Sequence, residues 1–572
     1  MGKNALAAGI FFEIADLLEL QGVQWKPAAY RKAALAIESM GDDVEDIYVA
    51  GGLKALMGIP GVGENIGKKL EEIVTTGRLE YLGELRAPYP FDMESLTRIP
   101  GMGLKRAKKL FDALGIKNAS ELKAAAQAGR VRAVDGFGAK SEGALLRGIA
   151  LSEKSRGRML LGYALDEIDA LIANIRAHSQ VERISPAGSV RRMKETIGDL
   201  DVLVTSKKPV AVMGYFTSLP EVDRVIAKGE TKSSVVMKSG LAVDVRVVAD
   251  AEYGSALQYF TGSKEHNIAI RRLAISKGFK LSEYGLFKGA KRVAGRTEEE
   301  IYRALGLDIM PPEMREDMGE LAAAAAHALP SVVGYGEMKG DFHAHSTWSD
   351  GQLSVDEMAR AAKGMRYEYF ALTDHAGTLA VARALNSRQL SARAKEIELA
   401  EKKAGIRIFN GAEVDINKDG SLSIGDDALA NLDYVVAAIH SNFSLPEAEM
   451  TARVIAGMKN RYVTALAHPS AGLIGSREPI ALAWERVYEA AAENGTYLEI
   501  NAFPERMDLP GAQVKAAKDG YGAKFVIGTD AHNAAHLGFM RLGVAIARRG
   551  WLEKKDVLNA QPLATVEAAL AR

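Results

Sequence analysis

Two aspartates spaced two residues apart stand at the start of a run that has the character of a β-strand. Asp199 and Asp201 open the segment 199–204, and the period of two in a strand puts both carboxylates on one face. A second strand-like run, 241–248, carries Asp244. If the two strands are neighbours, the three carboxylates surround one point, where hard oxygen ligands suit Mg²⁺ or Mn²⁺. Two such ions roughly 3.5–4 Å apart clamp an in-line phosphoryl displacement.

A short glycine-containing loop, 187–192, precedes the aspartate pair. Gly188 and Ser189 are small enough for backbone amide groups to approach a phosphate, and Arg192 adds a fork of donors for its oxygens. A lone Asp-x-Asp is more simply a turn with two solvated carboxylates. Because the loop, the pair and the third aspartate occur in order, the pattern favours metal-dependent transfer of a phosphoryl group.

A hydrophobe-x-Gly-hydrophobe-Gly turn recurs three times in the first 140 residues, at 59–63, 99–103 and 134–138, each time before basic residues. Any single copy is typical of an ordinary turn between helices. Glycines before a helix leave its first N–H groups free for an anion, and three copies followed by lysines therefore predict contacts to phosphates. Such contacts position a nucleic acid without reading its sequence. The residues expected at this interface are Gly61, Gly63, Lys68, Gly101, Gly103, Lys108, Lys109, Gly136 and Gly138.

Histidines and acids gather in the second half, where seven of the ten histidines follow residue 340. His343 and His345 lie two apart on an expected strand, and Asp350 follows in a loop. Strands alternate with helices over this half, which predicts a barrel with polar residues at the carboxyl ends of its strands. Imidazole and carboxylate ligands without cysteine suit Mn²⁺, Zn²⁺ or Fe²⁺. The other strand-end motifs are 372–375, 411–413, 438–440, 466–469, 498–501 and 528–532.

Composition limits the class of protein. The chain has 572 residues, which is too many for one core, and equal numbers of basic and acidic residues, 73 each. There is no cysteine, so disulfides and thiolate metal sites are excluded. No apolar run is long enough to cross a bilayer, and acidic residues interrupt the N-terminal apolar stretch. We therefore expect a cytoplasmic, globular protein of several domains with no membrane contact.

The loop and the three aspartates resemble the nucleotidyltransferase signature of family X DNA polymerases. The resemblance implies that Ser189 and Arg192 hold the triphosphate of an incoming dNTP. Ala242 departs from the family, which has an arginine beside the third aspartate, so proton handling or primer positioning at Asp244 is expected to differ. The other nucleotide contacts implied are Gly188, the aromatic pair Tyr259 and Phe260 beside the sugar, Gly262, Asn267 at the minor-groove edge, and Arg271 near the template.

The turns resemble helix-hairpin-helix elements, and the first 88 residues resemble the amino-terminal lyase domain of the same family. By that register Lys69 falls at the Schiff-base lysine and Tyr30 at a pocket aromatic. A lysine nucleophile needs a depressed pKa. A plain phosphate contact for Lys69 stays the alternative, since Asn65 replaces another lysine of the family pattern.

The second half resembles the PHP (polymerase and histidinol phosphatase) domain. This family has a distorted (β/α)₇ barrel and a site for three ions that activate water for hydrolysis of a phosphate ester. His536 and His327 match none of its motifs and are expected to be structural. The implied ligands are His343, His345, Asp350, His375, Glu413, His440, His468, Asp530 and His532.

Taken together, the resemblance covers nearly the whole chain and is to bacterial and archaeal family X polymerases with a C-terminal PHP domain. It implies a polymerase that fills short gaps during DNA repair, a 3′–5′ exonuclease in the PHP domain, and a monomer acting on gapped or primer-template DNA with dNTPs. Cleavage at abasic sites stays open. The competing hypotheses are a nucleotidyltransferase joined to a small-molecule phosphatase and a DNA-end scaffold with inactive sites. The expected domains are a lyase-like helical domain at 1–88, a thumb-like helical domain at 89–155, a palm at 156–262, a fingers-like domain at 263–335 and the PHP domain at 336–572.

Overall fold

The computed structural model describes residues 3–38, 43–93, 96, 99, 102–139, 141–143, 145–146, 149, 158–379 and 382–571. The chain divides into two compact units. The smaller comprises Met1–Arg156 and Gly475–Glu478, and the larger comprises Gly157–Ile474 and Pro479–Arg572. None of the described helices is both long and apolar enough to span a bilayer.

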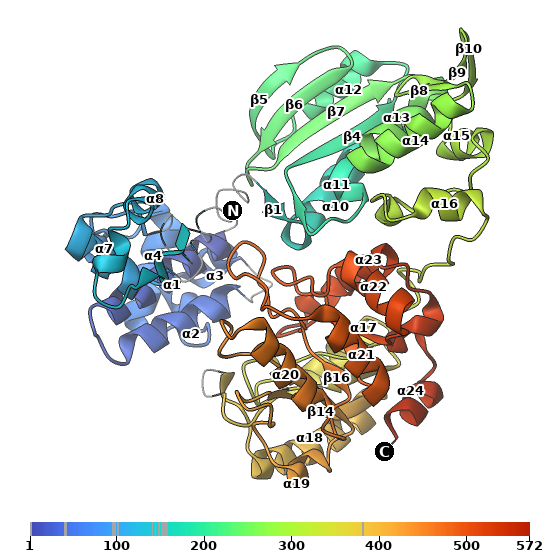
Figure 1. Ribbon diagram of the computed structural model, residues 1–572. Helices are drawn as coiled ribbons and strands as arrows, with labels where there is room; N and C mark the ends of the chain where they lie inside the picture. Colours follow the sequence, from blue (N-terminus) through green and yellow to red (C-terminus); the bar gives the residue numbers. More distant parts are fainter. Residues whose placement is uncertain are drawn as a thin grey trace. The chain divides into compact units, whose positions relative to one another are not determined.

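The smaller unit is helical, as the sequence predicts (Figure 1). Gly63 and Gly103 each stand immediately before a helix and have extended backbone, at ψ of 178° and 164°, and neither of these two helix starts has a side-chain cap. Apolar residues of these helices form one core cluster that includes Phe11, Leu70 and Leu110. The helices are α1 Lys3–Leu20, α2 Lys26–Glu38, α3 Val44–Leu56, α4 Glu64–Thr76, α5 Glu80–Arg86, α7 Leu104–Leu114 and α8 Ala119–Gln127.

A five-stranded sheet in the order β2-β4-β7-β6-β5 forms the palm (Figure 1). Strands β4 and β7 are parallel neighbours, and the other pairs are antiparallel. Leu200, Val202 and Val204 of β4 belong to the core cluster that contains α10 and α12, whereas Leu203 on the opposite face packs with α13. The elements are α10 Leu161–Ala177, β2 Arg183–Pro186, α11 Gly188–Arg191, β4 Asp199–Thr205, α12 Pro209–Phe216, β5 Val222–Lys228, β6 Lys232–Met237, β7 Ala242–Val248 and α13 Tyr253–Thr261.

Two local expectations about this half were wrong. The loop that carries Gly188 is a single helical turn, α11. The high helix propensity of alanine predicts a helix over 321–329. The helix ends at Ala325 instead, because His327 has a left-handed backbone (φ 53°) and the N–H of Ala328 bonds back to the carbonyl of Ala323. The elements after the palm are α14 Lys264–Ser276, β8 Lys280–Ser282, β9 Gly285–Lys288, β10 Lys291–Ala294, α15 Glu298–Ala304, the 3₁₀ turn η3 Pro312–Met314 and α16 Glu320–Ala325.

The C-terminal half is a parallel barrel. Its strands follow the order β11-β12-β14-β15-β16-β17-β18, with β13 paired to β14. Their residues are almost all buried, which is typical of parallel strands covered by helices, and Figure 1 shows those helices around the strands. The N–H of His345 bonds to the carbonyl of Ala531 at 2.8 Å, which joins the first and last segments of the barrel.

The barrel elements agree with the expected alternation of strands and helices. The strands are β11 Gly340–Asp341, β12 Tyr369–Leu372, β13 His375–Ala376, β14 Arg407–Asp415, β15 Tyr434–Ala438, β16 Ala465–Leu466, β17 Tyr497–Asn501 and β18 Phe525–Gly528. The helices are α17 Val355–Gly364, α18 Ser387–Ala404, α19 Asp426–Leu429, α20 Glu447–Met458, α21 Trp484–Asn494, α22 Gly511–Tyr521, α23 Met540–Arg549 and α24 Leu563–Leu570.

Candidate active sites

The three palm carboxylates converge, as the two strand patterns predict. Asp201 on β4 and Asp244 on β7 are direct partners in the parallel pair, and Asp199 lies on the same face two residues earlier. The like charges interact: burial, followed by Asp199 and Asp244, raises the pKa of Asp201 to about 6. Such a cluster of carboxylates is unfavourable until cations neutralise it, which fits a metal site.

Asp244 has two cationic neighbours that the sequence analysis did not identify. The Nζ atom of Lys232 lies 2.6 Å from its Oδ2, and a guanidinium nitrogen of Arg246 lies 3.7 Å away. Burial opposes charge on Asp244, but Lys232, Ser234 and Arg246 lower its pKa below the ordinary value. Lys232 on β6 therefore places a cation at the third aspartate, on the strand β7 that begins at Ala242.

The raised pKa of Asp201 leads to a stability prediction for the ion-free protein. The folded protein disfavours the charged carboxylate of Asp201, which lowers the free energy of unfolding. This loss of stability is complete above pH 6 and disappears below pH 4, near the pKa of aspartate in the unfolded chain. Asp201→Asn should therefore raise the free energy of unfolding at pH 7.5 by about 1–2 kcal/mol, allowing for partial exposure. The gain should shrink at pH 5. Thermal unfolding with a chelator measures it, with exposed Asp223→Asn as control; equal gains at both pH values would contradict the prediction.

The turn α11 lies against the aspartates. Gly188 has φ of 62°, and a Cβ atom there would lie 3.3 Å from Oδ2 of Asp201, so glycine fits best. The N–H of Ala187 bonds to the carbonyl of Asp201 at 2.8 Å, which fixes the start of the turn to β4. Ser189 follows within the turn, and Arg192 at its end pairs through Nε with Glu316 at 2.9 Å.

The expected nucleotide contacts lie next to one another on α13 and α14. Tyr259 and Phe260 pack edge to face with ring centres 5.0 Å apart, and Arg271 lies over Tyr259 at 4.9 Å. Asn267 donates from its amide to the carbonyl of Tyr259 at 2.7 Å. Gly262 (φ 72°) leaves room for Arg192: a Cβ atom there would lie 3.0 Å from Nη1 of that arginine. The structure thus brings the whole predicted set together.

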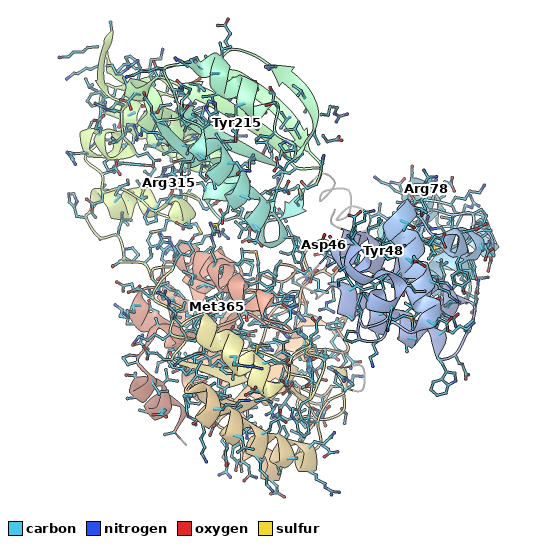
Figure 2. The ribbon with its side chains drawn as sticks, turned by 180° about the vertical axis from the view of Figure 1, so that it is seen from behind. Asp46, Tyr48, Arg78, Tyr215, Arg315 and Met365 are labelled. Carbon is cyan, nitrogen blue, oxygen red and sulfur yellow. The ribbon has the colours of Figure 1, made fainter. Side chains whose placement is uncertain are left out.

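A buried ion network beneath this segment escaped the sequence analysis. Arg191 and Arg315, which is labelled in Figure 2, both pair with Glu298, at 2.6 and 2.5 Å. Burial opposes ionisation of Glu298, but the two arginines hold its pKa at about 2. Arg191 therefore supports the fold, whereas its neighbour Arg192 is the arginine on the predicted nucleotide side.

All nine predicted ligands of the barrel meet at one end of its strands. Glu413 is central: its Oε1 lies 2.9 Å from Nε2 of His468 and 3.3 Å from Nε2 of His440. Its Oε2 lies 3.1 Å from Nδ1 of His375. Three overlapping groups have the spacing to hold an ion. They are His343, His345 and Asp530; His345, Asp350 and His375; and His375, Glu413 and His440.

Unpaired imidazole nitrogens support cation binding at this cluster. Nε2 of His343, both ring nitrogens of His345 and Nδ1 of His468 are buried without a hydrogen bond. Buried polar atoms are costly unless a partner satisfies them, and a cation is such a partner. His532 lies at the rim with Nε2 3.6 Å from Asp350. Asp530 has a left-handed backbone, φ 55°, which is uncommon for aspartate and typical of a functional site.

Two carboxylates orient the histidines from behind. Glu499 accepts from Nδ1 of His343 at 2.6 Å, and Asp415 pairs with Nδ1 of His440 at 2.7 Å, which leaves each Nε2 directed at the cluster. Both acids lie on strands, β17 and β14, and the motif 498–501 was noted in the sequence without a role for Glu499. His536 stacks on Phe539 at 5.1 Å and belongs to none of the three groups, in keeping with a structural role.

The hairpin residues lie on the helical unit. Lys68 pairs with Glu64 at 2.7 Å, Lys108 with Asp112, and Lys109 with Asp135 at 2.7 Å beside the turn of Gly136 and Gly138. These pairs are solvent-exposed and therefore weak, so phosphates can replace the carboxylates. Gly61 (φ 84°) packs closely on Lys32 of α2. Gly101 and Lys140, in the second and third turns, lie outside the described residues.

The two predicted lyase residues differ in exposure. Tyr30 is buried and packs edge to face on Phe11 at 5.7 Å, and burial raises its pKa to about 12. Lys69 is half-buried with its Nζ atom 4.7 Å from the ring centre of Tyr81. The lyase role stays a prediction.

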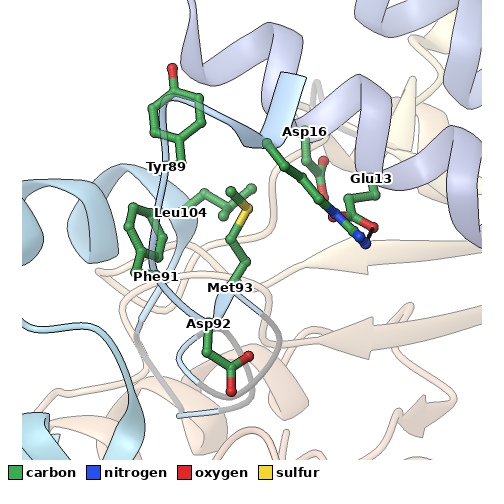
Figure 3. Close-up of a pocket in the computed structure, with 8 residues that line it drawn as sticks. Glu13, Asp16, Tyr89, Phe91, Asp92, Met93 and Leu104 are labelled. Atoms are coloured by element: carbon green, nitrogen blue, oxygen red, sulfur yellow. Dashed lines mark hydrogen bonds and ion pairs between the residues drawn. The ribbon is translucent and has the colours of Figure 1, made fainter. Parts of the chain in front are cut away.

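A separate pocket of about 550 Å³ lies in the helical unit (Figure 3). Its lining includes Glu13, which forms a forked ion pair with Arg86 at 2.5 and 2.6 Å, and the aromatic residues Tyr89 and Phe91. It contains none of the palm aspartates or barrel histidines, so it is distinct from both candidate metal centres.

Family models match most of the chain. A model described as helix-hairpin-helix domain matches residues 2–79, and one described as SAM-like helix-hairpin-helix tandem matches 93–150. A model described as DNA polymerase beta thumb matches 256–316, and one described as PHP domain matches 341–503.

Similar proteins include one that matches from end to end. The chain is 37% identical over 565 residues to the DNA polymerase/3′–5′ exonuclease PolX of Bacillus subtilis (strain 168), covering 98% of each chain. It is 27% identical over 334 residues to DNA polymerase lambda of Rattus norvegicus, covering 53% of this chain and 54% of the relative. It is 32% identical over 210 residues to a probable phosphatase of Acetivibrio thermocellus, covering 35% of this chain and 81% of the relative.

Proposed function

The chain belongs to the PolX family of DNA polymerases/3′–5′ exonucleases, and we propose that it fills short gaps in DNA during repair and trims 3′ ends. The observation that carries this proposal is that one chain holds two separate clusters suited to phosphoryl transfer. One is the aspartate triad of the palm, and the other is the histidine and carboxylate cluster of the barrel.

In the palm, the residues position the primer end and the dNTP. Mg²⁺ or Mn²⁺ held by Asp199, Asp201 and Asp244 would neutralise the phosphates and favour attack by the primer 3′-hydroxyl. The backbone of Gly188 and Ser189 and the guanidinium of Arg192 bind the triphosphate in this proposal. For Arg192 this requires exchange of the Glu316 carboxylate for phosphate oxygens.

The aromatic pair Tyr259 and Phe260 shapes the sugar site, in keeping with the resemblance to family X. Asn267 holds the backbone of Tyr259 through its amide, and Arg271 covers the ring. Lys232 lies at Asp244 and keeps that carboxylate charged and oriented.

In the barrel, the proposed reaction is hydrolysis of the 3′-terminal phosphodiester. Mn²⁺, Zn²⁺ or Fe²⁺, three ions in all, would activate water and stabilise the charge that develops on phosphorus. Glu499 and Asp415 hold the rings of His343 and His440 so that each Nε2 faces the cluster. Arg506, whose Nε lies 3.5 Å from Asp530, adds positive charge at the same rim.

The proposed partners are gapped or primer-template DNA and dNTPs. We propose, from the resemblance alone, that the protein acts as a monomer. We propose the five domains at the boundaries expected from the sequence, with the hairpins of residues 1–155 binding the DNA backbone. The thumb model matches 256–316, so the name thumb belongs to the segment expected to be fingers-like and not to 89–155.

A gapped-duplex assay with dNTPs and Mg²⁺ or Mn²⁺, resolving extension and degradation, tests the function. Extension into the gap together with shortening of the 3′ end is the expected result. A protein that hydrolyses only small phosphate esters, or only binds DNA ends, would instead support one of the two competing hypotheses. An abasic-site duplex in the same assay decides whether the barrel also cleaves abasic sites, which the sequence leaves open.

The hairpin lysines predict a salt effect on DNA binding. Each lysine that binds a phosphate displaces a counterion, so the logarithm of the binding constant should fall linearly with the logarithm of the salt concentration, without sequence preference. Replacing Lys108 and Lys109 by alanine should reduce the slope by about 0.9 for each of the two lysines that binds a phosphate in the wild type. Binding titrations over a range of salt measure the slope, with Lys291→Ala, on strand β10 outside the hairpin segment 1–155, as control. An unchanged slope would remove both lysines from the interface.

A further inference from the structure

The last residue of α23, in the barrel half of the chain, contacts the palm directly behind α11. Arg549 donates from Nη2 to the carbonyl of Arg192 at 3.0 Å and to the carbonyl of Met193, and from Nη1 to the carboxylate of Glu195. Its side chain is only 4% exposed. One guanidinium therefore holds three acceptors of the segment that follows the predicted triphosphate loop.

These acceptors fix the end of a very short helix. The turn α11 contains four residues, Gly188–Arg191, and the carbonyls of Gly188, Ser189 and Val190 already accept from backbone N–H groups of residues 192–194, so Arg549 holds the next two carbonyls along the chain. An arginine at that end satisfies the carbonyls that follow and interacts favourably with the helix terminus. Met193 immediately after has φ of 53°, a backbone conformation that persists only where its surroundings hold it. Arg549, which lies outside the palm, stabilises this backbone conformation through its hydrogen bond to the carbonyl of Met193.

The opposite side of the same segment faces the nucleotide. The carbonyl of Arg192 accepts a hydrogen bond from Arg549. On the other side, the guanidinium of Arg192 donates to the carboxylate of Glu316 and to the carbonyl of Thr261. A shift of this carbonyl therefore moves the arginine expected to bind the triphosphate. At the start of the turn, Gly188 packs so closely on Asp201 that a Cβ atom would lie 3.3 Å from its Oδ2, which leaves the turn little freedom to shift.

The barrel is shaped to accept this buried arginine. A Cβ atom at Gly511, the first residue of α22, would lie 2.8 Å from the Cβ of Arg549, so only glycine leaves space for the stem. Burial opposes charge on Glu195, but Arg549 and then Lys194 hold its pKa below the ordinary value, so the ion pair stays intact at neutral pH. A buried guanidinium without such partners would be strongly destabilising.

We propose that Arg549, contributed by the hydrolase half of the chain, is a positioning residue for nucleotide addition. It holds the carbonyls behind Arg192 and thereby sets the distance between the triphosphate loop and the palm aspartates. This inference rests on the proposed role of the segment Gly188–Arg192 in binding the dNTP. It makes the barrel part of the polymerase site's support, independent of the barrel's own chemistry.

The test compares three variants of the full-length chain on gapped DNA. Arg549→Met keeps the bulk of the side chain and removes the donors, and Arg549→Lys restores one charged donor group. Arg541→Met is the matched control, because Arg541 also reaches the palm from α23 but pairs with exposed Asp169 of α10, away from the loop. The readouts are KM and kcat for a dNTP, the 3′–5′ exonuclease rate, and the unfolding temperature.

Arg549→Met should raise the dNTP KM about tenfold or more, as expected for the loss of a hydrogen bond to a charged group, with the exonuclease rate within twofold. Arg549→Lys should recover part of this loss, and Arg541→Met should leave KM unchanged. An unchanged KM in Arg549→Met, or an equal loss of both activities, would overturn the proposal. Arg192→Met tests the premise separately, because it removes the guanidinium proposed to bind the triphosphate: if it leaves KM unchanged, the proposed role of the loop is wrong and the proposal for Arg549 is wrong with it.

Discussion

Replacing Asp199 or Asp201 by alanine is expected to abolish nucleotide addition and to leave hydrolysis by the barrel intact. Both carboxylates lie on one face of β4, and Asp201 is the direct strand partner of Asp244, so either change breaks the proposed metal site. Ions in such a site stabilise the transition state by several kcal/mol, and a loss of about 4 kcal/mol slows the step by about 10³-fold.

The control for this prediction is Asp223→Ala. Asp223 is an exposed aspartate on β5, at the edge of the same sheet and away from the triad. The Asp223→Ala variant should extend a primer as the wild type does. Comparison with it separates the loss of the metal site from the general effect of removing a carboxylate from the palm. Single-turnover extension of a gapped duplex, with degradation followed in the same lanes, measures both activities. Near-normal extension by Asp199→Ala or Asp201→Ala would show that the triad is not the polymerase centre.

The strand patterns were enough to predict the palm site because the period of two leaves little freedom. Once 199–205 and 242–248 are adjacent, the register places Asp201 opposite Asp244. The cation at Asp244 was not predictable in the same way. Lys232 reaches Asp244 from β6, and its approach depends on the antiparallel register between β6 and β7, which no local pattern specifies.

The barrel ligands were predicted from the resemblance of the strand-end motifs to the PHP domain, but the groups behind them were not. Glu499 and Asp415 are single acids on buried strands, and the sequence carries no sign of the histidine that each one orients. The contact of Arg549 with the carbonyls of Arg192 and Met193 joins residues more than 350 positions apart and uses main-chain acceptors. Sequence reasoning about residue types therefore had no signal for it.

Replacing His440 or His468 by alanine should remove most 3′–5′ hydrolysis and spare nucleotide addition. Both Nε2 atoms lie within 3.3 Å of Glu413 Oε1, at the centre of the cluster, so either change removes a predicted ligand. The loss should be about 10²-fold or more, because several kcal/mol of charge stabilisation depend on the ions. Nucleotide addition should survive, because Asp199, Asp201 and Asp244 are untouched.

Manganese should support degradation better than magnesium. Six of the nine predicted ligands are histidines, and imidazole prefers ions softer than Mg²⁺. The palm triad, by contrast, offers only carboxylate oxygens, and this type of ligand suits both Mg²⁺ and Mn²⁺. The comparison uses labelled single-stranded and gapped DNA with each metal, for the wild type and both histidine variants.

His327→Ala is the control for the histidine variants, because His327 is exposed and pairs with Asp308 outside the barrel. It should leave both activities unchanged. Full degradation by His440→Ala and His468→Ala would show that the cluster is structural. If both activities are lost together, the unfolding temperature has to be measured as well. A lower unfolding temperature would show that the histidines stabilise the barrel, and the contact of Arg549 with the palm would explain why nucleotide addition is lost too. Loss of hydrolysis alone, at an unchanged unfolding temperature, identifies the cluster as the nuclease centre.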